Sequence, residues 1–62
     1  MTTGQKIRQA RKALNINQTL AGRLLGVNQK RWSDIEIDRY NITVKSLRRI
    51  AKALGVEPAD LL

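Results

Sequence analysis

A glycine-centred turn between two short amphipathic segments is the feature that most limits the folds open to this chain. The first segment runs from Gln18 to Leu25, and the second begins after Asn28. Gly26 stands where a helix can end with a left-handed residue, and Asn28 is a residue type that caps the start of a helix. Because only three residues connect the segments, the two helices must cross steeply and the second must project. The sequence predicts a helix-turn-helix motif.

Helical periodicity continues on both sides of this motif and predicts an all-α fold. Apolar residues recur at spacings of three and four, and no stretch alternates with the two-residue period of a strand. We expect Ile7, Ala10 and Leu14 to face inward from the first helix, and Leu61 and Leu62 to close the core. The expected helices, in a single domain of 62 residues, cover about 3–14, 18–25, 29–37, 44–54 and 58–62.

The charge of the chain points to a polyanionic partner. Twelve Lys and Arg residues against five Asp and Glu residues give a net charge of +7, which favours nucleic acid or an anionic membrane surface. The amphipathic helices turn their apolar stripes inward, which argues against a membrane surface. No apolar run approaches the roughly 20 residues of a membrane span, and no signal-peptide pattern opens the chain. We expect a cytoplasmic location and no contact with a membrane.

Catalytic and metal chemistry has no visible constellation in the sequence. The chain contains no cysteine and no histidine, which excludes disulfides and the usual zinc ligand sets. The carboxylates other than Glu36 are scattered, with no adjacent base or nucleophile: Asp34, Asp38, Glu57 and Asp60. We expect no enzymatic activity, no metal site and no cofactor.

Several short patterns, taken together, resemble one known family. Gln18 opens the second helix, Gly26 forms the turn, and Ser33 precedes the pair Ile35–Glu36. The other matching residues are Ala21–Gly22, Ile50–Ala51 and Ala53–Leu54–Gly55–Val56. On these residues the chain is similar, over nearly its whole length, to the lambda-repressor-like DNA-binding domains of the phage repressor and Cro type. The resemblance implies a compact five-helix fold that binds double-stranded DNA with its third helix in the major groove.

Several positions depart from the pattern of this family. Gly22 stands where alanine is usual, which is understandable if the two motif helices approach closely there, although glycine costs about 1 kcal/mol in helix propensity. Ile37 and Asp38 replace the usual asparagine-glycine pair. The turn after the third helix is therefore expected to differ, although Asp tolerates left-handed backbone geometry.

Two charged residues lie on or beside core-facing stripes. Arg11 follows Ile7 by four residues, and Glu36 follows Trp32 by four. Domains that resemble this one carry an arginine and a glutamate at these positions as a partly buried bridge. We expect Arg11 and Glu36 to form a structural ion pair rather than a catalytic site.

The side of the third helix opposite Trp32 and Ile35 is the expected reading surface. Gln29 projects from the first turn, which is the end that enters the major groove in helix-turn-helix docking. Glutamine matches adenine, lysine matches guanine, aspartate accepts from the cytosine amino group, and an apolar side chain touches the thymine methyl. The base-reading candidates are Gln29, Lys30, Ser33, Asp34 and Ile37. The alternative for Lys30 and Asp34, four residues apart, is an ion pair in solvent.

Phosphate contacts are expected on both sides of that helix. The start of the second helix offers free backbone N–H groups at the positive end of a dipole. The segment after the third helix resembles the phosphate-contacting loop of the family. The candidates are Asn17, Gln18, Arg23, Arg31, Arg39, Tyr40, Asn41, Thr43 and Lys45. The alternative for Asn17 and Thr43 is a simple helix cap.

The sequence leaves open how such a domain would act. It fits a transcriptional repressor or regulator domain that acts by occupying DNA, or an engineered DNA binder on the same scaffold. Binding as a homodimer and binding as a monomer are both compatible with it. A different class of function, a protein-interaction module of the antitoxin or adaptor kind, would use Leu20 and Leu24 as an exposed contact patch.

Overall fold

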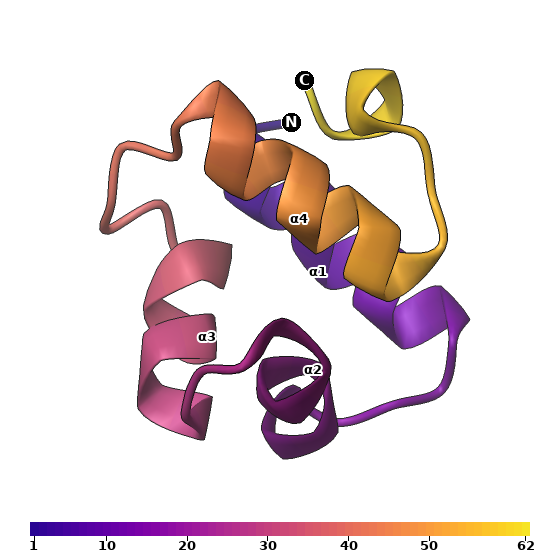
Figure 1. Cartoon of the computed structure of the whole chain (residues 1–62), viewed down its shortest axis with the longest axis vertical. Helices are drawn as coiled ribbons and strands as arrows, with labels where there is room; N and C mark the ends of the chain where they lie inside the picture. Colours follow the sequence, from indigo (N-terminus) through magenta and orange to yellow (C-terminus); the bar gives the residue numbers. More distant parts are fainter.

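Four α-helices and one 3₁₀-helix make up the chain in the computed structural model, which describes residues 1–62 (Figure 1). They are α1 (Thr3–Ala13), α2 (Gln18–Leu25), α3 (Gln29–Glu36), α4 (Val44–Leu54) and the 3₁₀-helix η1 (Pro58–Leu61). No strand is present, so the predicted all-α class is confirmed. The bounds of α2 and α4 agree with the prediction, while α1 and α3 each end one residue earlier than expected.

The prediction of a fifth α-helix over residues 58–62 was wrong. The backbone N–H of Asp60 donates to Glu57 O at 2.9 Å, and that of Leu62 donates to Ala59 O at 3.4 Å. Both bonds span three residues, as in a 3₁₀-helix. Pro58 and Asp60 are favourable at the start of either helix type, but four residues are too few to establish the α-helical pattern.

Local signals explain where each α-helix begins and ends. A side-chain oxygen accepts a hydrogen bond from a backbone N–H of the first turn at every start, which satisfies a donor that has no partner inside the helix. The capping residues are Thr2, Asn17, Asn28 and Thr43, and Gln5 completes a capping box with Thr2. Gly26 and Gly55 end α2 and α4 with φ values of 90° and 70°, in the left-handed region that favours glycine.

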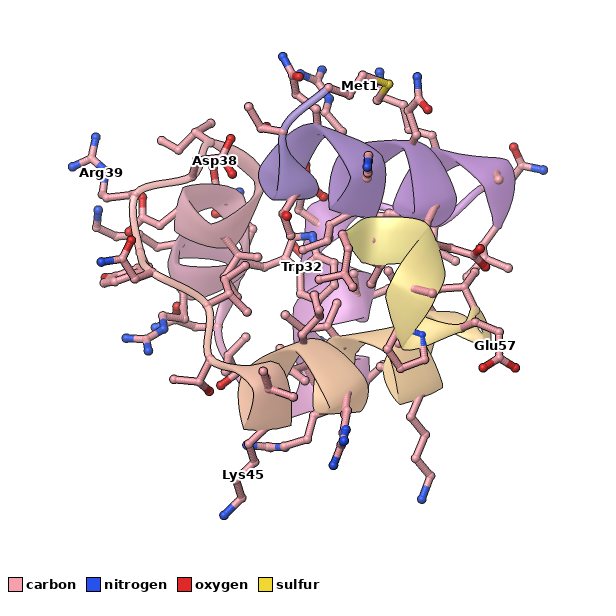
Figure 2. The ribbon with its side chains drawn as sticks, turned by 90° about the horizontal axis from the view of Figure 1, so that it is seen from above. Met1, Trp32, Asp38, Arg39, Lys45 and Glu57 are labelled. Carbon is pink, nitrogen blue, oxygen red and sulfur yellow. The ribbon has the colours of Figure 1, made fainter.

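The core lies where the four α-helices and η1 meet, and Trp32 is its largest member. Figure 2 shows this side chain at the centre of the molecule, and it is completely buried. Its eight partners are Ile7, Ala21, Ile35, Leu47, Ile50, Ala51, Leu54 and Leu61. Every α-helix contributes to this cluster, so the elements depend on one another for burial.

Two leucines expected in the core are exposed instead. Leu14 is 47% exposed, because it follows the last residue of α1 and the chain then turns through Asn15 with a φ of 57°. Leu62 is 68% exposed, because η1 already ends at Leu61, which fills the space beside α1 and α4. Of the apolar residues expected inside α1, Ile7 is fully buried and Ala10 is partly buried.

The packing of the helices sets the position of α3 at one side of the molecule. In Figure 1, α4 lies in front of α1, and α2 and α3 lie together at the far end from both termini. α3 packs against α2 and α1, while α2 also packs against α4. The loop from α3 to α4 runs along the outside of the molecule (Figure 1). No helix has the length and apolar character needed to cross a membrane.

Two glycines mark places where backbones approach closely. A Cβ atom added at Gly22 would lie 2.7 Å from Val27 O and 3.2 Å from Asn28 O, in the turn that leads to α3. A Cβ atom at Gly4 would lie 2.6 Å from Glu36 O, at the end of α3. The close approach expected at Gly22 is therefore present, and α3 is held by backbone contacts at both of its ends.

The turn after α3 is fixed by Asp38. This residue has a φ of 60°, so it adopts the left-handed geometry expected for it. Its Oδ1 accepts from the backbone N–H of Gly4 at 2.8 Å, and its Oδ2 accepts from the hydroxyl of Thr2. A carboxylate from the loop thereby stabilises the N-terminus of α1, whose dipole favours negative charge.

Candidate nucleic-acid interface

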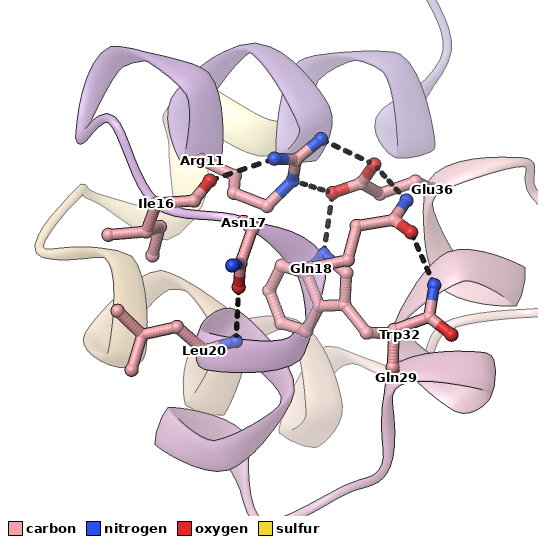
Figure 3. Close-up of polar contacts among 8 residues, drawn as sticks. All are labelled: Arg11, Ile16, Asn17, Gln18, Leu20, Gln29, Trp32 and Glu36. Carbon is pink, nitrogen blue, oxygen red and sulfur yellow. Dashed lines mark hydrogen bonds and ion pairs between the residues drawn. The ribbon is translucent and has the colours of Figure 1, made fainter.

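A buried ion pair underlies the candidate interface (Figure 3). Arg11 Nε lies 2.5 Å from Glu36 Oε2, and Arg11 Nη2 donates to Glu36 Oε1 at 3.3 Å. The Glu36 side chain is 2% exposed. Trp32 Nε1 also donates to Glu36 Oε2, and Arg11 Nη1 donates to the backbone oxygen of Ile16. The expected pair is present and joins α1 to the end of α3.

The contacts of Glu36 keep its carboxyl group ionised. Burial by itself raises the pKa of this group. Hydrogen bonds from Arg11, Gln18 and Trp32, together with the charge of Arg11, outweigh burial and hold the pKa below its ordinary value. Glu36 is therefore a carboxylate at neutral pH and acts only as a hydrogen-bond acceptor.

Two glutamines continue the network towards the surface, and the sequence did not predict this link. Gln18 Nε2 donates to Glu36 Oε1 at 3.0 Å, and Gln29 Nε2 donates to Gln18 Oε1 at 2.7 Å. The two glutamines open α2 and α3, and the steep crossing of these helices brings their first turns together. Gln18 Nε2 donates only this one hydrogen bond, and a phosphate contact from its second N–H stays a prediction.

The base-reading candidates do not all lie on the exposed side of α3. Gln29, Lys30 and Ile37 are exposed, and Ser33 is half-buried. Asp34, in contrast, is only 8% exposed, so its expected position on the open stripe was wrong. The chain turns back after α3, and Arg39 N donates to Asp34 O, which covers this residue.

The charged partners of Asp34 come from both sides. Lys30 Nζ lies 3.9 Å from Asp34 Oδ2, and Arg39 Nε lies 3.5 Å from Asp34 Oδ1. The Lys30–Asp34 pair is the alternative that the four-residue spacing allowed. The lysine side chain is 81% exposed, and it is therefore free to leave this pair for an anionic partner.

The phosphate candidates after α3 form an exposed basic rim along the loop. Figure 2 shows Arg39 and Lys45 pointing away from the body of the molecule. The guanidinium of Arg31 stacks 4.3 Å from the centre of the Tyr40 ring, which joins α3 to the loop. Asn41 is also exposed. This rim lies beside the exposed side of α3.

Two of the remaining phosphate candidates serve as helix caps. Asn17 Oδ1 accepts from the backbone N–H of Leu20 at 2.8 Å, and Thr43 Oγ1 accepts from that of Ser46 at 3.1 Å. Both side chains are nevertheless exposed, as is Arg23 on α2. Capping leaves the amide group of Asn17 free to donate.

A second arginine joins α4 to the end of α2, and the sequence did not predict this contact. Arg49 Nη2 donates to the backbone oxygen of Leu25 at 3.1 Å, so α4 holds the end of α2 beside the turn. The regular run of basic residues on α4 gives no signal that distinguishes this one. No three residues of the His, Cys, Asp or Glu types gather where they could hold a metal ion.

Comparison with known proteins assigns the fold and the motif to a class. Residues 7–61 match the helix-turn-helix family, and the chain belongs to that family. Among curated relatives, it is 35% identical over its full length to the immunity repressor protein of Bacillus phage phi105, of which it spans 43%. It is 38% identical over 95% of its length to control protein C.BamHI of Bacillus amyloliquefaciens, of which it spans 74%.

Solved structures give the same assignment. The chain matches the P22 c2 repressor, solved in complex with synthetic operator 9T in the presence of Tl+, with a TM-score of 0.88 and 32% identity. That match covers 100% of this chain and 94% of the repressor chain. The restriction-modification controller protein C.AhdI of Aeromonas hydrophila also has a TM-score of 0.88, at 27% identity over 97% of this chain and 87% of its own. The predicted lambda-repressor-like fold is thereby confirmed.

Proposed function

We propose that this chain, as a single domain, binds double-stranded DNA in a sequence-specific way and regulates transcription by occupying its site. The observation that carries the proposal is the full-length match to a repressor solved with its operator, at 32% identity. The exposed side of α3 supports it, because this helix projects with Gln29 in its first turn. The domain would act without catalysing a reaction, in the cytoplasm and at the nucleoid.

Base reading is assigned to the side chains that α3 leaves accessible. Gln29 and Lys30 would contact base edges, and Ile37 would contact a thymine methyl. Ser33 would contact a base edge with its shorter side chain. Asp34 takes a different part from the one its sequence position suggested. With its carboxylate shared between Lys30 and Arg39, it would hold these two cations beside the groove.

Residues on both sides of α3 would contact phosphates of the duplex. On one side are Asn17, Gln18 and Arg23 of the α2 region, and on the other are Arg31, Arg39, Tyr40, Asn41, Thr43 and Lys45. These contacts position the helix in the groove but carry no sequence information themselves. The net charge of +7 would add attraction to any duplex.

The proposal is tested by selection from a random duplex library at near-physiological salt, followed by titration of the enriched site. A compact enriched motif, which loses its preference at one or two base pairs in Gln29→Ala, is the expected result. Lys12→Ala, an exposed change on α1, is the matched control and should enrich the same motif. Binding without any enriched motif would contradict sequence-specific reading.

The symmetry of the enriched site reports the stoichiometry. Two copies of the domain would read two half-sites whose centres lie about 34 to 36 Å apart. A two-fold symmetric motif with that spacing supports a homodimer on DNA. A single asymmetric motif, with one domain per duplex in sedimentation, supports a monomeric reader.

A second candidate function is binding to another protein through α2. Leu20 and Leu24 lie four residues apart and are 42% and 53% exposed, so they form an apolar patch on this helix. Substituting both with lysine should leave the enriched DNA motif unchanged if the DNA-binding function is the relevant one. If the chain shows no DNA binding at all, this patch becomes the leading candidate interface.

A further inference from the structure

The hydrogen bonds between the buried ion pair and the surface of α3 run in one direction (Figure 3). Gln29 Nε2 donates to Gln18 Oε1 at 2.7 Å, and Gln18 Nε2 donates to Glu36 Oε1 at 3.0 Å. Gln29 is exposed, whereas the Glu36 side chain is 2% exposed. Two consecutive bonds therefore join a candidate base-reading amide to a buried carboxylate.

The carboxylate allows only one orientation of both amides. An ionised Glu36 accepts hydrogen bonds and donates none. If the amide of Gln18 were flipped, its oxygen would face Glu36 Oε1, and two acceptors would repel each other. The amide nitrogen of Gln18 must face Glu36, so its oxygen faces Gln29, and Gln29 must in turn offer an N–H.

Glu36 is itself held in place, so it is a fixed reference for this orientation. Arg11 Nε and Trp32 Nε1 both donate to its Oε2, and Arg11 Nη2 donates to its Oε1. Arg11 also donates to the backbone oxygen of Ile16. The carboxylate cannot rotate without breaking several buried hydrogen bonds, each of which is costly to leave unmade.

The remaining groups of Gln29 match one base better than the others. With one N–H engaged by Gln18, this amide has one N–H and its oxygen left for DNA. The major-groove edge of adenine presents one acceptor and one donor, whereas that of guanine presents two acceptors. A free glutamine amide has two N–H groups for the two acceptors of guanine, but the tethered amide of Gln29 has only one.

We propose that Glu36, acting through Gln18, is a positioning residue that makes Gln29 read adenine and reject guanine. This inference rests on the proposed function, because it requires Gln29 to meet a base edge. It adds to that function a role for a residue that never touches DNA.

The first step of the test finds the base pair that Gln29 reads. Duplexes carrying each single base change in the selected site are bound to the wild-type chain and to Gln29→Ala at one salt concentration. The base pair at which Gln29→Ala abolishes discrimination is the one assigned to this side chain. There the wild type should favour adenine over guanine by about tenfold or more.

The second step breaks the link while leaving the buried ion pair intact. Gln18→Met keeps the length of the side chain but can neither donate to Glu36 nor accept from Gln29. The adenine-to-guanine ratio should fall by about tenfold at this base pair and stay within about twofold elsewhere. Gln9→Met, the same change at an exposed position of α1, should keep the wild-type ratio.

The third step tests Glu36 itself. The neutral amide in Glu36→Gln can face Gln18 with either its oxygen or its nitrogen, so the orientation is no longer imposed. The ratio should fall as in Gln18→Met, and combining the two changes should produce no further loss. If Glu36→Gln alone does not fold, Arg11→Met combined with Glu36→Gln removes both buried charges and replaces it in the comparison.

Three results would overturn the positioning role. The first is an unchanged adenine-to-guanine ratio in Gln18→Met, and the second is additive losses of this ratio in the combined variant. The third is a Gln29→Ala variant that keeps the wild-type discrimination at every base pair. A wild-type chain with no preferred site would overturn the proposed function and this inference together. A preferred site with an unchanged ratio in Gln18→Met would overturn the positioning role alone.

Discussion

The Glu36 carboxylate accepts hydrogen bonds from three different elements of the chain. Arg11 lies on α1, Gln18 opens α2, and Trp32 precedes Glu36 by one turn of α3. A buried charge is tolerated only when it is paired and hydrogen-bonded, and here both carboxylate oxygens are occupied. Removing one partner of such a pair costs about 3 to 5 kcal/mol. A chain of 62 residues has a total stability of similar size.

At the residue scale, the lowered pKa of Glu36 predicts a loss of stability in acid. The ionised form is favoured in the folded state, so its contribution is fully present above the ordinary pKa of this group, 4.5. The contribution is lost as the pH falls from there through the lower pKa of the folded state. Glu36→Gln should therefore be less stable than wild type at neutral pH, and the difference should shrink in this acid range. Urea unfolding followed by circular dichroism measures it.

The exposed glutamate provides the control for this prediction. Glu57→Gln makes the same chemical change at an exposed position near η1 and should leave the acid profile close to that of the wild type. A Glu36→Gln variant whose deficit stayed constant from neutral to acid pH would show that the ionised carboxylate is not the source of the stability.

At the element scale, the crossing of α2 and α3 depends on the missing side chain of Gly22. Gly22→Ala gains about 1 kcal/mol in helix propensity, but its methyl group would lie 2.7 Å from Val27 O. That oxygen belongs to the backbone of the turn, so relief requires the turn to open. We expect a net loss of about 1 to 3 kcal/mol in the free energy of unfolding, measured by urea denaturation.

Thr19→Ala is the control, because it introduces alanine at an exposed position of the same helix. It changes the helix propensity without crowding the turn. It should alter the free energy of unfolding by less than about 0.5 kcal/mol. A Gly22→Ala variant that was more stable than wild type would mean that the turn can relax without cost.

The joint between the α3–α4 loop and α1 gives a second prediction at this scale. Asp38→Ala removes the acceptor for Gly4 N–H and for the hydroxyl of Thr2, and it also places alanine at a φ of 60°. Asn15→Ala has the same backbone cost at a φ of 57°, without a hydrogen bond from its side chain to lose. Thermal unfolding of the two variants should differ by about 1 to 3 kcal/mol, with Asp38→Ala the less stable. Equal losses would assign the whole effect to backbone strain.

The helices and their caps could be predicted from sequence because their signals are local. Gly26 and Asn28 act on the neighbouring turn alone, and they mark the end of α2 and the start of α3 correctly. The burial of Asp34 could not be predicted, because it depends on where the loop runs after α3 has ended. The exposure of Leu14 has the same origin, since a helical stripe predicts a side chain's direction only while the helix continues.

The link between Gln18 and Gln29 also lies beyond a local pattern. The two residues are eleven positions apart on different helices, and only the crossing angle places them in contact. The expected pair of Arg11 and Glu36 was within reach because the family resemblance supplied the partner. The assignment of residues to bases and phosphates remains a proposal. The burial of Asp34 is the observation that changed one of these assignments.

At the scale of the whole molecule, charge and size determine how the domain would meet a duplex. The Cα atoms extend over 23 × 21 × 20 Å, and a net charge of +7 is carried on this small volume. With side chains added, two copies side by side fit the spacing of about 34 Å between half-sites on one face of the duplex. Attraction to phosphates is screened over about 8 Å at physiological salt.

At this scale, the number of phosphates that the domain neutralises predicts the salt dependence of binding. If five phosphates are neutralised, log K should fall against log salt with a slope of about −4.5, so affinity drops several hundredfold from about 50 to 200 mM salt. Arg39→Ala removes one exposed contact and should flatten the slope by about one unit for every DNA sequence. Titrations by fluorescence anisotropy of labelled duplexes measure both slopes.

The matched control for this prediction is Lys12→Ala, which removes one positive charge from α1, outside the phosphate candidates. Its slope should stay close to that of the wild type. Equal flattening by Lys12→Ala and Arg39→Ala would mean that net charge, rather than a contact at the loop, controls the salt response.

Trp32, the one tryptophan of the chain, is fully buried and donates its indole N–H to Glu36. Its emission should therefore be blue-shifted in the folded chain and should shift to the red on unfolding, without any added dye. The same carboxylate accepts from Gln18, which accepts from Gln29 at the surface of α3. The chain thus contains its own optical probe, placed three hydrogen bonds away from the side chain with which it would read DNA.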